Sequence, residues 1–176
     1  MKLVVAISGA SGVELGFDFL KYLPDEIETH LVISENAAKV AKHENGRIIE
    51  HDDSDIAASI ASGSFGADAT AIIPCSMNTL AKIACGISDN LTTRVAAVAL
   101  KERKKLLIAP REMPFSTISL ENMYKLSLSG AIIAPPIPAY YSECETLEDI
   151  HRFLVGKWFD LLGIDNELYR RWEGKR

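Results

Sequence analysis

Several features that mark other protein classes are missing from this chain of 176 residues. Its three cysteines, Cys75, Cys85 and Cys144, form no C-x-x-C pair, which excludes a disulfide-dense secreted scaffold and favours a reducing cytoplasm. Its four histidines show no H-E-x-x-H or related spacing, so no metal site is predicted. No apolar run is long enough to cross a bilayer, and the N-terminal residues resemble a first strand more than a signal peptide.

Positive charge is also scarce. The net charge of −5 and the pI of about 5.4 argue against a general nucleic-acid binder, which needs many phosphate contacts from Lys and Arg. The densest basic run, residues 101–105, is typical of a solvated helix end. With 48% hydrophobic residues, the composition is globular, and the length predicts a single domain over residues 1–176.

Apolar runs and helix-like segments alternate along the chain. Five runs are rich in Val and Ile and lack polar alternation, as in strands buried on both faces of a parallel sheet. These runs are residues 3–8, 29–34, 69–74, 105–110 and 131–135. Helical patterns are found at residues 12–23, 35–43, 54–61, 76–85, 91–103, 117–129 and 147–162. The order predicts an α/β fold, a doubly wound parallel sheet with right-handed crossovers.

Ligands bind such sheets beyond the carboxyl ends of the strands. The first run ends in the turn GASG, residues 9–12, and the following helix start offers N–H groups to a phosphate. Its G-x-x-G spacing differs from the dinucleotide fingerprint, and Ser34, not an acidic residue, ends the second run. A mononucleotide is therefore favoured over a nicotinamide dinucleotide. Glu14, in the first helical turn, must point away from any bound anion.

Polar residues also follow the third and fourth runs. The segment 76–79 offers several hydrogen-bonding side chains, although helix capping by Ser76 or Asn78 is the simpler interpretation. Arg111 and Glu112 lie in a proline-stiffened loop, where they form either part of a site or a surface ion pair of little energetic weight.

The fifth run is followed by PPIPAYY, residues 135–141, which either faces a ligand or packs between subunits. The strand ends include no histidine base and no G-x-S-x-G elbow, so Ser11 is not expected to be a hydrolase nucleophile. The predicted site is instead one that holds a phosphate and a flat ring.

Six motifs, in order and spacing, resemble those of the UbiX-like flavin prenyltransferases: ISGASG, PCSMNTLAKIACGISDNL, RVAAVALKERKKL, APREMPFS, SLENMYKLSLSGA and PPIPAYY. The resemblance covers nearly the whole chain. It implies a Rossmann-like, three-layer flavoprotein fold and a homododecamer with the flavin near subunit contacts. It also implies metal-independent transfer of a dimethylallyl group from dimethylallyl monophosphate to N5 and C6 of reduced FMN. The prenylated FMN would serve a separate UbiD-type decarboxylase, for example in ubiquinone biosynthesis.

The resemblance assigns roles to individual residues. FMN contacts fall on Gly9, Ala10, Ser11, Ser34, Ser76, Met77, Asn78, Thr79, Arg94 and Arg111. The substrate phosphate falls to Ser11, Lys101, Tyr141 and Lys157, and the catalytic carboxylates are Glu112 and Glu44. At Lys157 the family often has Arg. Lys keeps the charge but loses the bidentate fork, which puts phosphate affinity in question more than reaction type; otherwise Lys157 is a solvated helical lysine.

Two rival functions share this fold or this ligand. Flavin-dependent cysteine decarboxylases typically read PASANT where this chain has PCSMNT, and they use an early active-site histidine. His43 and His51 lie in that region but outside the expected motif. The second rival, a flavin-binding protein without turnover, is disfavoured because Lys101, Glu112 and Tyr141 all occupy the family's positions.

Overall fold

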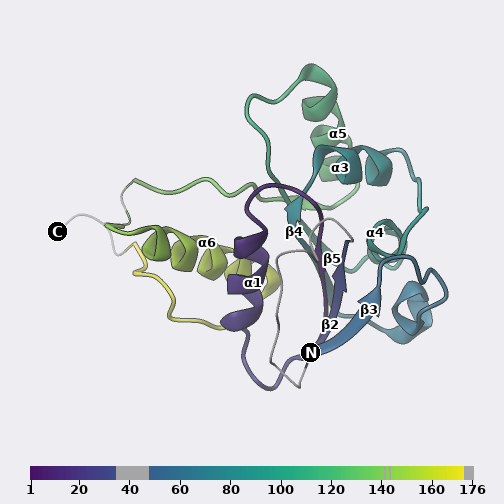
Figure 1. Cartoon of the computed structure of the whole chain (residues 1–176), viewed down its shortest axis with the longest axis horizontal. Helices are drawn as coiled ribbons and strands as arrows, with labels where there is room; N and C mark the ends of the chain where they lie inside the picture. Colours follow the sequence, from purple (N-terminus) through teal and green to yellow (C-terminus); the bar gives the residue numbers. More distant parts are fainter. Residues whose placement is uncertain (35–47, 141, 143, 173–176) are drawn as a thin grey trace.

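The computed structural model describes residues 1–34, 48–140, 142 and 144–172. Six parallel strands form one sheet in the order β3-β2-β1-β4-β5-β6 (Figure 1). Their bounds are β1 Lys2–Ile7, β2 Glu28–Ile33, β3 Ile48–Asp52, β4 Ala69–Cys75, β5 Lys105–Pro110 and β6 Ile132–Ile133. The predicted doubly wound parallel sheet is confirmed, and the five apolar runs all contribute strands, although only two residues of the run 131–135 pair as β6.

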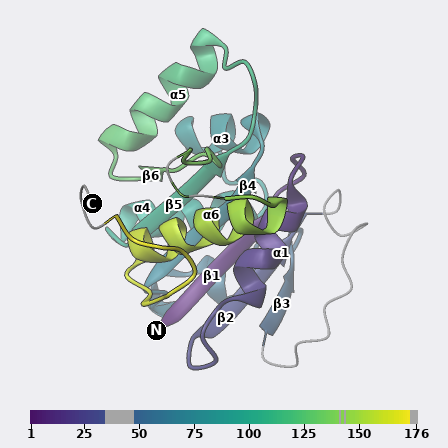
Figure 2. The same cartoon turned by 90° about the vertical axis from the view of Figure 1, so that its left-hand side faces the viewer.

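Helices cover both faces of the sheet and make three layers. Helices α1 (Val13–Lys21) and α6 (Leu147–Leu162) lie on one face, and α3 (Met77–Ala84) and α4 (Leu91–Lys101) lie on the other (Figure 1). Helix α5 (Thr117–Leu128) packs beyond α3 and projects from the body in both views (Figure 2). Alternate residues of β1 feed the two cores: Leu3, Val5 and Ile7 point to one, and Val4 and Ala6 to the other.

Side-chain caps fix where most of these helices begin. Ser76, Asn90 and Ser116 each accept a hydrogen bond from the backbone N–H three residues later. Thr146 forms the predicted capping box with Asp149 and starts α6 at Leu147. These helix starts therefore follow from local sequence.

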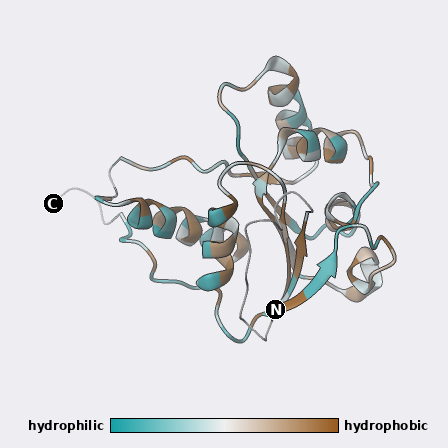
Figure 3. Ribbon diagram, in the orientation of Figure 1, coloured by the Kyte–Doolittle hydropathy of each residue, from teal (hydrophilic) through white to brown (hydrophobic). Residues whose placement is uncertain are grey.

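Strand β3 was not predicted from the sequence. It lies at the edge of the sheet, pairs only with β2 among the described strands, and reads Ile-Ile-Glu-His-Asp. In Figure 3 it is hydrophobic at its start and hydrophilic toward its end. An edge strand needs no continuous apolar run, because one side of it faces solvent.

The predicted helix at residues 54–61 is wrong. The structure has turns there and one short 3₁₀ helix, η1 (Ser59–Ala61), and a second, η2 (Gly63–Phe65), follows the segment. Asp52 Oδ1 accepts from Ser54 N at 2.8 Å, and Asp55 Oδ1 accepts from Ala57 N at 3.1 Å. Such local bonds compete with a helical ladder. The predicted helix at residues 35–43 lies outside the described residues.

Two histidines join β2 to β3. His30 is buried; its Nδ1 lies 2.9 Å from His51 Nε2, and its Nε2 lies 3.1 Å from Glu28 Oε1. An ionised carboxylate only accepts, so His30 donates to Glu28 and accepts from His51. Loss of hydration, together with the adjacent His30, lowers the pKa of His51.

The lowered pKa predicts a loss of stability in acid. Neutral His51 contributes stability fully above the ordinary histidine pKa of 6.5, and this contribution is lost as pH falls through the lowered folded-state value. His51→Gln keeps a donor toward His30 but does not titrate. Thermal unfolding followed from about pH 7 to about pH 5 is expected to show a smaller fall in midpoint for this variant than for the wild type. Equal falls in both proteins would contradict the role given to His51.

The described residues lack two further features. They include no helix that is both long and apolar enough to span a membrane. They also include no cluster of three or more Asp, Glu, His or Cys side chains arranged to hold a metal ion.

Candidate active site

The switch point of the sheet lies between β1 and β4. The helices that follow these adjacent strands, α1 and α3, leave toward opposite faces, so a crevice opens beyond their carboxyl ends. Ser8, which is buried, links the two strand ends. Its hydroxyl donates to the Pro74 carbonyl at 2.9 Å and accepts from the Ser76 N–H at 2.8 Å. This link fixes the spacing of the two ligand-facing turns.

The turn at residues 9–12 leads into α1. Gly12 has φ 90°, a left-handed conformation that favours glycine, and no described side chain caps the helix there. The uncapped N–H groups and the helix dipole suit an anion. Ser11 is exposed beside them, and Glu14 is exposed as well. A Cβ at Gly16 would lie 2.4 Å from the Ile73 carbonyl oxygen, so glycine lets α1 approach β4 closely.

The loop after β4 caps helix α3 and also exposes a polar side chain that a ligand could contact. Ser76 Oγ accepts from Thr79 N at 3.2 Å and lies 2.9 Å from Thr79 Oγ1, so the capping interpretation of Ser76 is confirmed. Asn78 is exposed and Met77 half-buried beside this turn. Burial raises the pKa of the Cys75 thiol, which therefore stays protonated and is no nucleophile.

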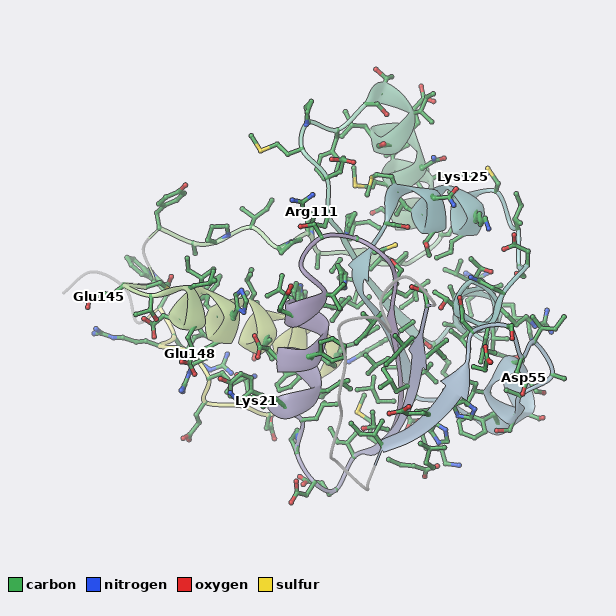
Figure 4. All side chains as sticks on the ribbon, in the orientation of Figure 1. Lys21, Asp55, Arg111, Lys125, Glu145 and Glu148 are labelled. Atoms are coloured by element: carbon green, nitrogen blue, oxygen red, sulfur yellow. The ribbon has the colours of Figure 1, made fainter. Side chains whose placement is uncertain are left out.

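The predicted pair Arg111 and Glu112 enters the crevice from the loop after β5. The Arg111 N–H donates to the Cys75 carbonyl at 3.1 Å, and Figure 4 shows Arg111 at this end of the sheet. Glu112 Oε1 accepts from the Met113 N–H at 2.9 Å. A groove of about 530 Å³ joins this loop to the turn before α1, to the Pro-rich segment after β6 and to α6. Its lining is Ser11, Gly12, Leu15, Pro110, Arg111, Glu112, Met113, Pro114, Phe115, Pro135, Pro136, Ile137, Leu147, Ile150, His151 and Leu154.

A second groove beyond the carboxyl ends of the strands is more acidic. It lies past β2 and β3 and includes Glu50, Asp52, Asp53 and Asp89. Carboxylates repel a phosphate, so the Ser11 groove is the better seat for an anionic ligand.

Three predicted residues lie elsewhere within one chain. Lys101 is at the end of α4, near the amino ends of β4 and β5, where its Nζ contacts Glu102 Oε1. Arg94, nearer the start of α4, donates from Nε to the Ala61 carbonyl at 3.1 Å. Lys157 is exposed on α6, with Nζ 5.8 Å from the centre of the Tyr169 ring. None of the three lines the Ser11 groove as the described residues form it. Glu44 and Tyr141 lie outside the described residues.

Sequence reasoning missed two contributors to the site. Ser8 gave no signal because it lies inside the first apolar run. His151 also lines the groove, and its Nδ1 is 2.6 Å from Asp18 Oδ2. The strand-end rule does not reach His151, because this residue lies on α6, on the flank of the apolar stripe formed by Leu147, Ile150 and Leu154.

A flavin mononucleotide fits this donor set. The Ser34 hydroxyl oxygen is buried and has no hydrogen-bond partner among the described residues, as expected of an atom that a bound group satisfies. Ser34 N donates to the Ile7 carbonyl at 3.0 Å, which places it at the end of β2 beside the β1 turn. Exposed Asn78 offers donors and acceptors to a ring.

Comparisons with known proteins agree with this geometry. The Flavoprotein family model matches residues 1–159. The chain is 53% identical to flavin prenyltransferase UbiX of Helicobacter pylori strain 26695, over 98% of each chain. The chain belongs to the UbiX-type flavin prenyltransferases. The family and enzyme class predicted from the motifs are thereby confirmed.

Two solved structures of family members match the fold closely. One is described as a dodecameric FMN-dependent UbiX-like decarboxylase from Escherichia coli O157:H7; it is 43% identical, with a TM-score of 0.91 over 99% of this chain and 100% of the other. The other is AnUbiX (PadA1) in complex with FMN and dimethylallyl pyrophosphate, 40% identical, with a TM-score of 0.91 over 99% of this chain and 98% of the other. The predicted flavoprotein-type fold is confirmed.

Proposed function

We propose that this UbiX-type chain acts as one flavin-binding domain and transfers a dimethylallyl group from dimethylallyl monophosphate to N5 and C6 of reduced FMN. The observation that carries the proposal is the groove that joins an uncapped helix start to Arg111, Glu112 and an apolar wall. The helix start suits the phosphate, and the apolar wall suits the prenyl chain. FMN supplies the nucleophilic ring atoms when it is bound.

The described residues divide the work of binding. Residues 9–11, Ser34, Ser76–Thr79 and Arg111 hold the flavin, as the family roles imply. Ser11 and the first N–H groups of α1 stabilise the phosphate as the allylic C–O bond breaks. Phe115, Ile137 and Leu154 exclude water from the allylic cation. Glu112, fixed by the Met113 N–H, moves a proton at the reacting end of the groove.

Five assignments rest on the family pattern alone. They place Arg94 with the FMN-binding residues, Lys101, Lys157 and Tyr141 on the substrate phosphate, and Glu44 beside Glu112 as a second carboxylate. Lys157 now interacts with the Tyr169 ring, and it would have to leave that ring to reach a phosphate.

The surface favours assembly into a larger oligomer. Helix α5 buries Met123 and Leu126 but leaves Ile118, Tyr124 and Leu128 about 70% exposed. This apolar face is of the kind that subunit contacts cover. Together with the dodecameric relative, this face supports a homododecamer.

The three free cysteines fit a protein located in the cytoplasm. A UbiD-type decarboxylase is the proposed recipient of the product.

Mass analysis of the flavin tests the proposed reaction. Anaerobic protein with reduced FMN and dimethylallyl monophosphate is expected to yield extracted flavin heavier by one C5H8 unit. Saturated isopentyl monophosphate should give no adduct, because it cannot form an allylic cation. Parallel reactions with the diphosphate and with a chelator test the choice of monophosphate and the independence from metal. Unmodified flavin, or decarboxylation of a cysteinyl peptide, would overturn the proposal.

A further inference from the structure

His151 is placed to act inside the groove. It lies on α6 and lines the same groove as Ser11 and Glu112, although none of the predicted functional positions included it. Its side chain is 18% exposed, so it is shielded but reachable by solvent and ligand. Asp18, on α1, lies behind it, with Oδ2 2.6 Å from His151 Nδ1.

The Asp18 contact decides which ring nitrogen carries the proton. An ionised carboxylate can only accept a hydrogen bond, so the Nδ1 atom of His151 is the donor. Nε2 is then left for the groove, as an acceptor in the neutral ring and as a donor in the imidazolium. Arg111 and Glu112, from the loop after β5, line the same groove as His151, and Glu148 lies three residues before it on α6.

A purely structural role does not account for this pair. Helices α1 and α6 already pack through Phe19 and Phe159, whose ring centres are 4.9 Å apart, and Tyr22 reaches Glu148. Both packed phenylalanines are buried, whereas His151 lines the groove. A carboxylate that orients a histidine facing a cavity is an arrangement used in proton transfer.

We propose that His151 is a further catalytic residue, which donates a proton from Nε2 to the departing phosphate, and that Asp18 is its positioning residue. The proposal rests on the proposed function. The allylic C–O bond breaks and its electron pair stays on the phosphate oxygen. The Nε2 proton passes to that phosphate and leaves a neutral imidazole, while the allylic carbon bonds to the acceptor. The partly exposed ring regains a proton from solvent.

The proton matters because phosphate is a better leaving group when it is protonated. The imidazolium also adds a positive charge near the α1 N-terminus, where the phosphate is proposed to bind. His151 thus supplies an acid for the phosphate in addition to Glu112, which follows the end of β5.

Three variants separate this role from a structural one. His151→Asn keeps a group that reaches Asp18 but removes Nε2, and is expected to lower kcat about tenfold to a hundredfold. Asp18→Asn is expected to lower kcat by a smaller factor. Arg152→Gln, at the adjacent exposed position on α6, is the matched control and should leave kcat unchanged. The dependence of kcat on pH is expected to differ between His151→Asn and the wild type, because the variant has no side chain at this position that can donate or regain a proton.

A binding measurement makes the test independent of turnover. Calorimetry of the FMN-loaded proteins with isopentyl monophosphate, which cannot react, is expected to show about tenfold weaker binding to His151→Asn. If only the unfolding temperature changes, while kcat, its pH profile and this affinity match the wild type, the inference is wrong. Failure of the wild type itself to prenylate FMN would instead overturn the proposed function.

Discussion

Glu112→Gln is expected to leave FMN bound and to slow prenyl transfer by about 10²- to 10⁴-fold, the usual contribution of a general acid or base. Gln keeps the oxygen that accepts from the Met113 N–H, so the loop at the groove should hold its shape. The glutamine amide cannot take up a proton, so the variant tests whether prenyl transfer needs proton transfer by Glu112. Flavin retention is measured by absorbance after gel filtration, and the rate by the appearance of prenylated flavin under anaerobic conditions.

The matched control for this prediction is Glu26→Gln. Glu26 is exposed in the turn before β2. It lies at the amino ends of the strands, whereas the groove lies beyond their carboxyl ends, so its neutralisation should not change the rate. An unimpaired Glu112→Gln enzyme would remove Glu112 from the mechanism. Loss of FMN from this variant would make Glu112 a binding residue.

Central strands could be predicted from sequence, and the edge of the sheet could not. The runs 3–8 and 69–74 are apolar because both faces of these strands are buried, so local composition identifies them. Strand β3 lacks this burial, and only its pairing with β2 makes it a strand. The segment 54–61 misled for a related reason: its alanines favour a helix, while Asp52 and Asp55 form local turns.

The site divides in a similar way. The strand-end rule found Ser11, Arg111 and Glu112 because a parallel sheet brings the carboxyl ends of its strands together. It did not find His151, since the contact with Asp18 joins residues 133 positions apart on two helices. No local pattern encodes such a pairing; it depends on how α6 returns across α1.

The position of Lys101 indicates that one chain alone does not supply every residue that the resemblance assigns to the substrate phosphate. The resemblance assigns it to the substrate phosphate, yet it lies near the amino ends of β4 and β5. A strand of six residues, such as β5, spans roughly 20 Å, so Lys101 cannot reach the groove of its own chain without refolding. If Lys101 contacts the phosphate, it must come from a neighbouring subunit.

Mixed assemblies of two inactive variants are expected to recover activity. Lys101→Gln and Glu112→Gln should each lose about a hundredfold or more in rate when assembled alone. When the two chains are co-expressed equally and assemble at random, about a quarter of the sites pair an intact Glu112 with an intact Lys101 from another subunit. The rate per FMN of the purified mixture, compared with the wild type, measures this fraction.

The double variant supplies the discriminating control. Co-assembly of wild-type chains with chains carrying both substitutions leaves about a quarter of sites intact if Lys101 comes from a neighbour, but about half if both residues come from one chain. Lys104→Gln, at an adjacent exposed lysine, should be fully active alone. An active Lys101→Gln enzyme would remove Lys101 from the phosphate site. Inactive mixtures, with half the sites surviving in the double-variant experiment, would require Lys101 to reach the groove of its own chain, against the geometry of α4 and β5.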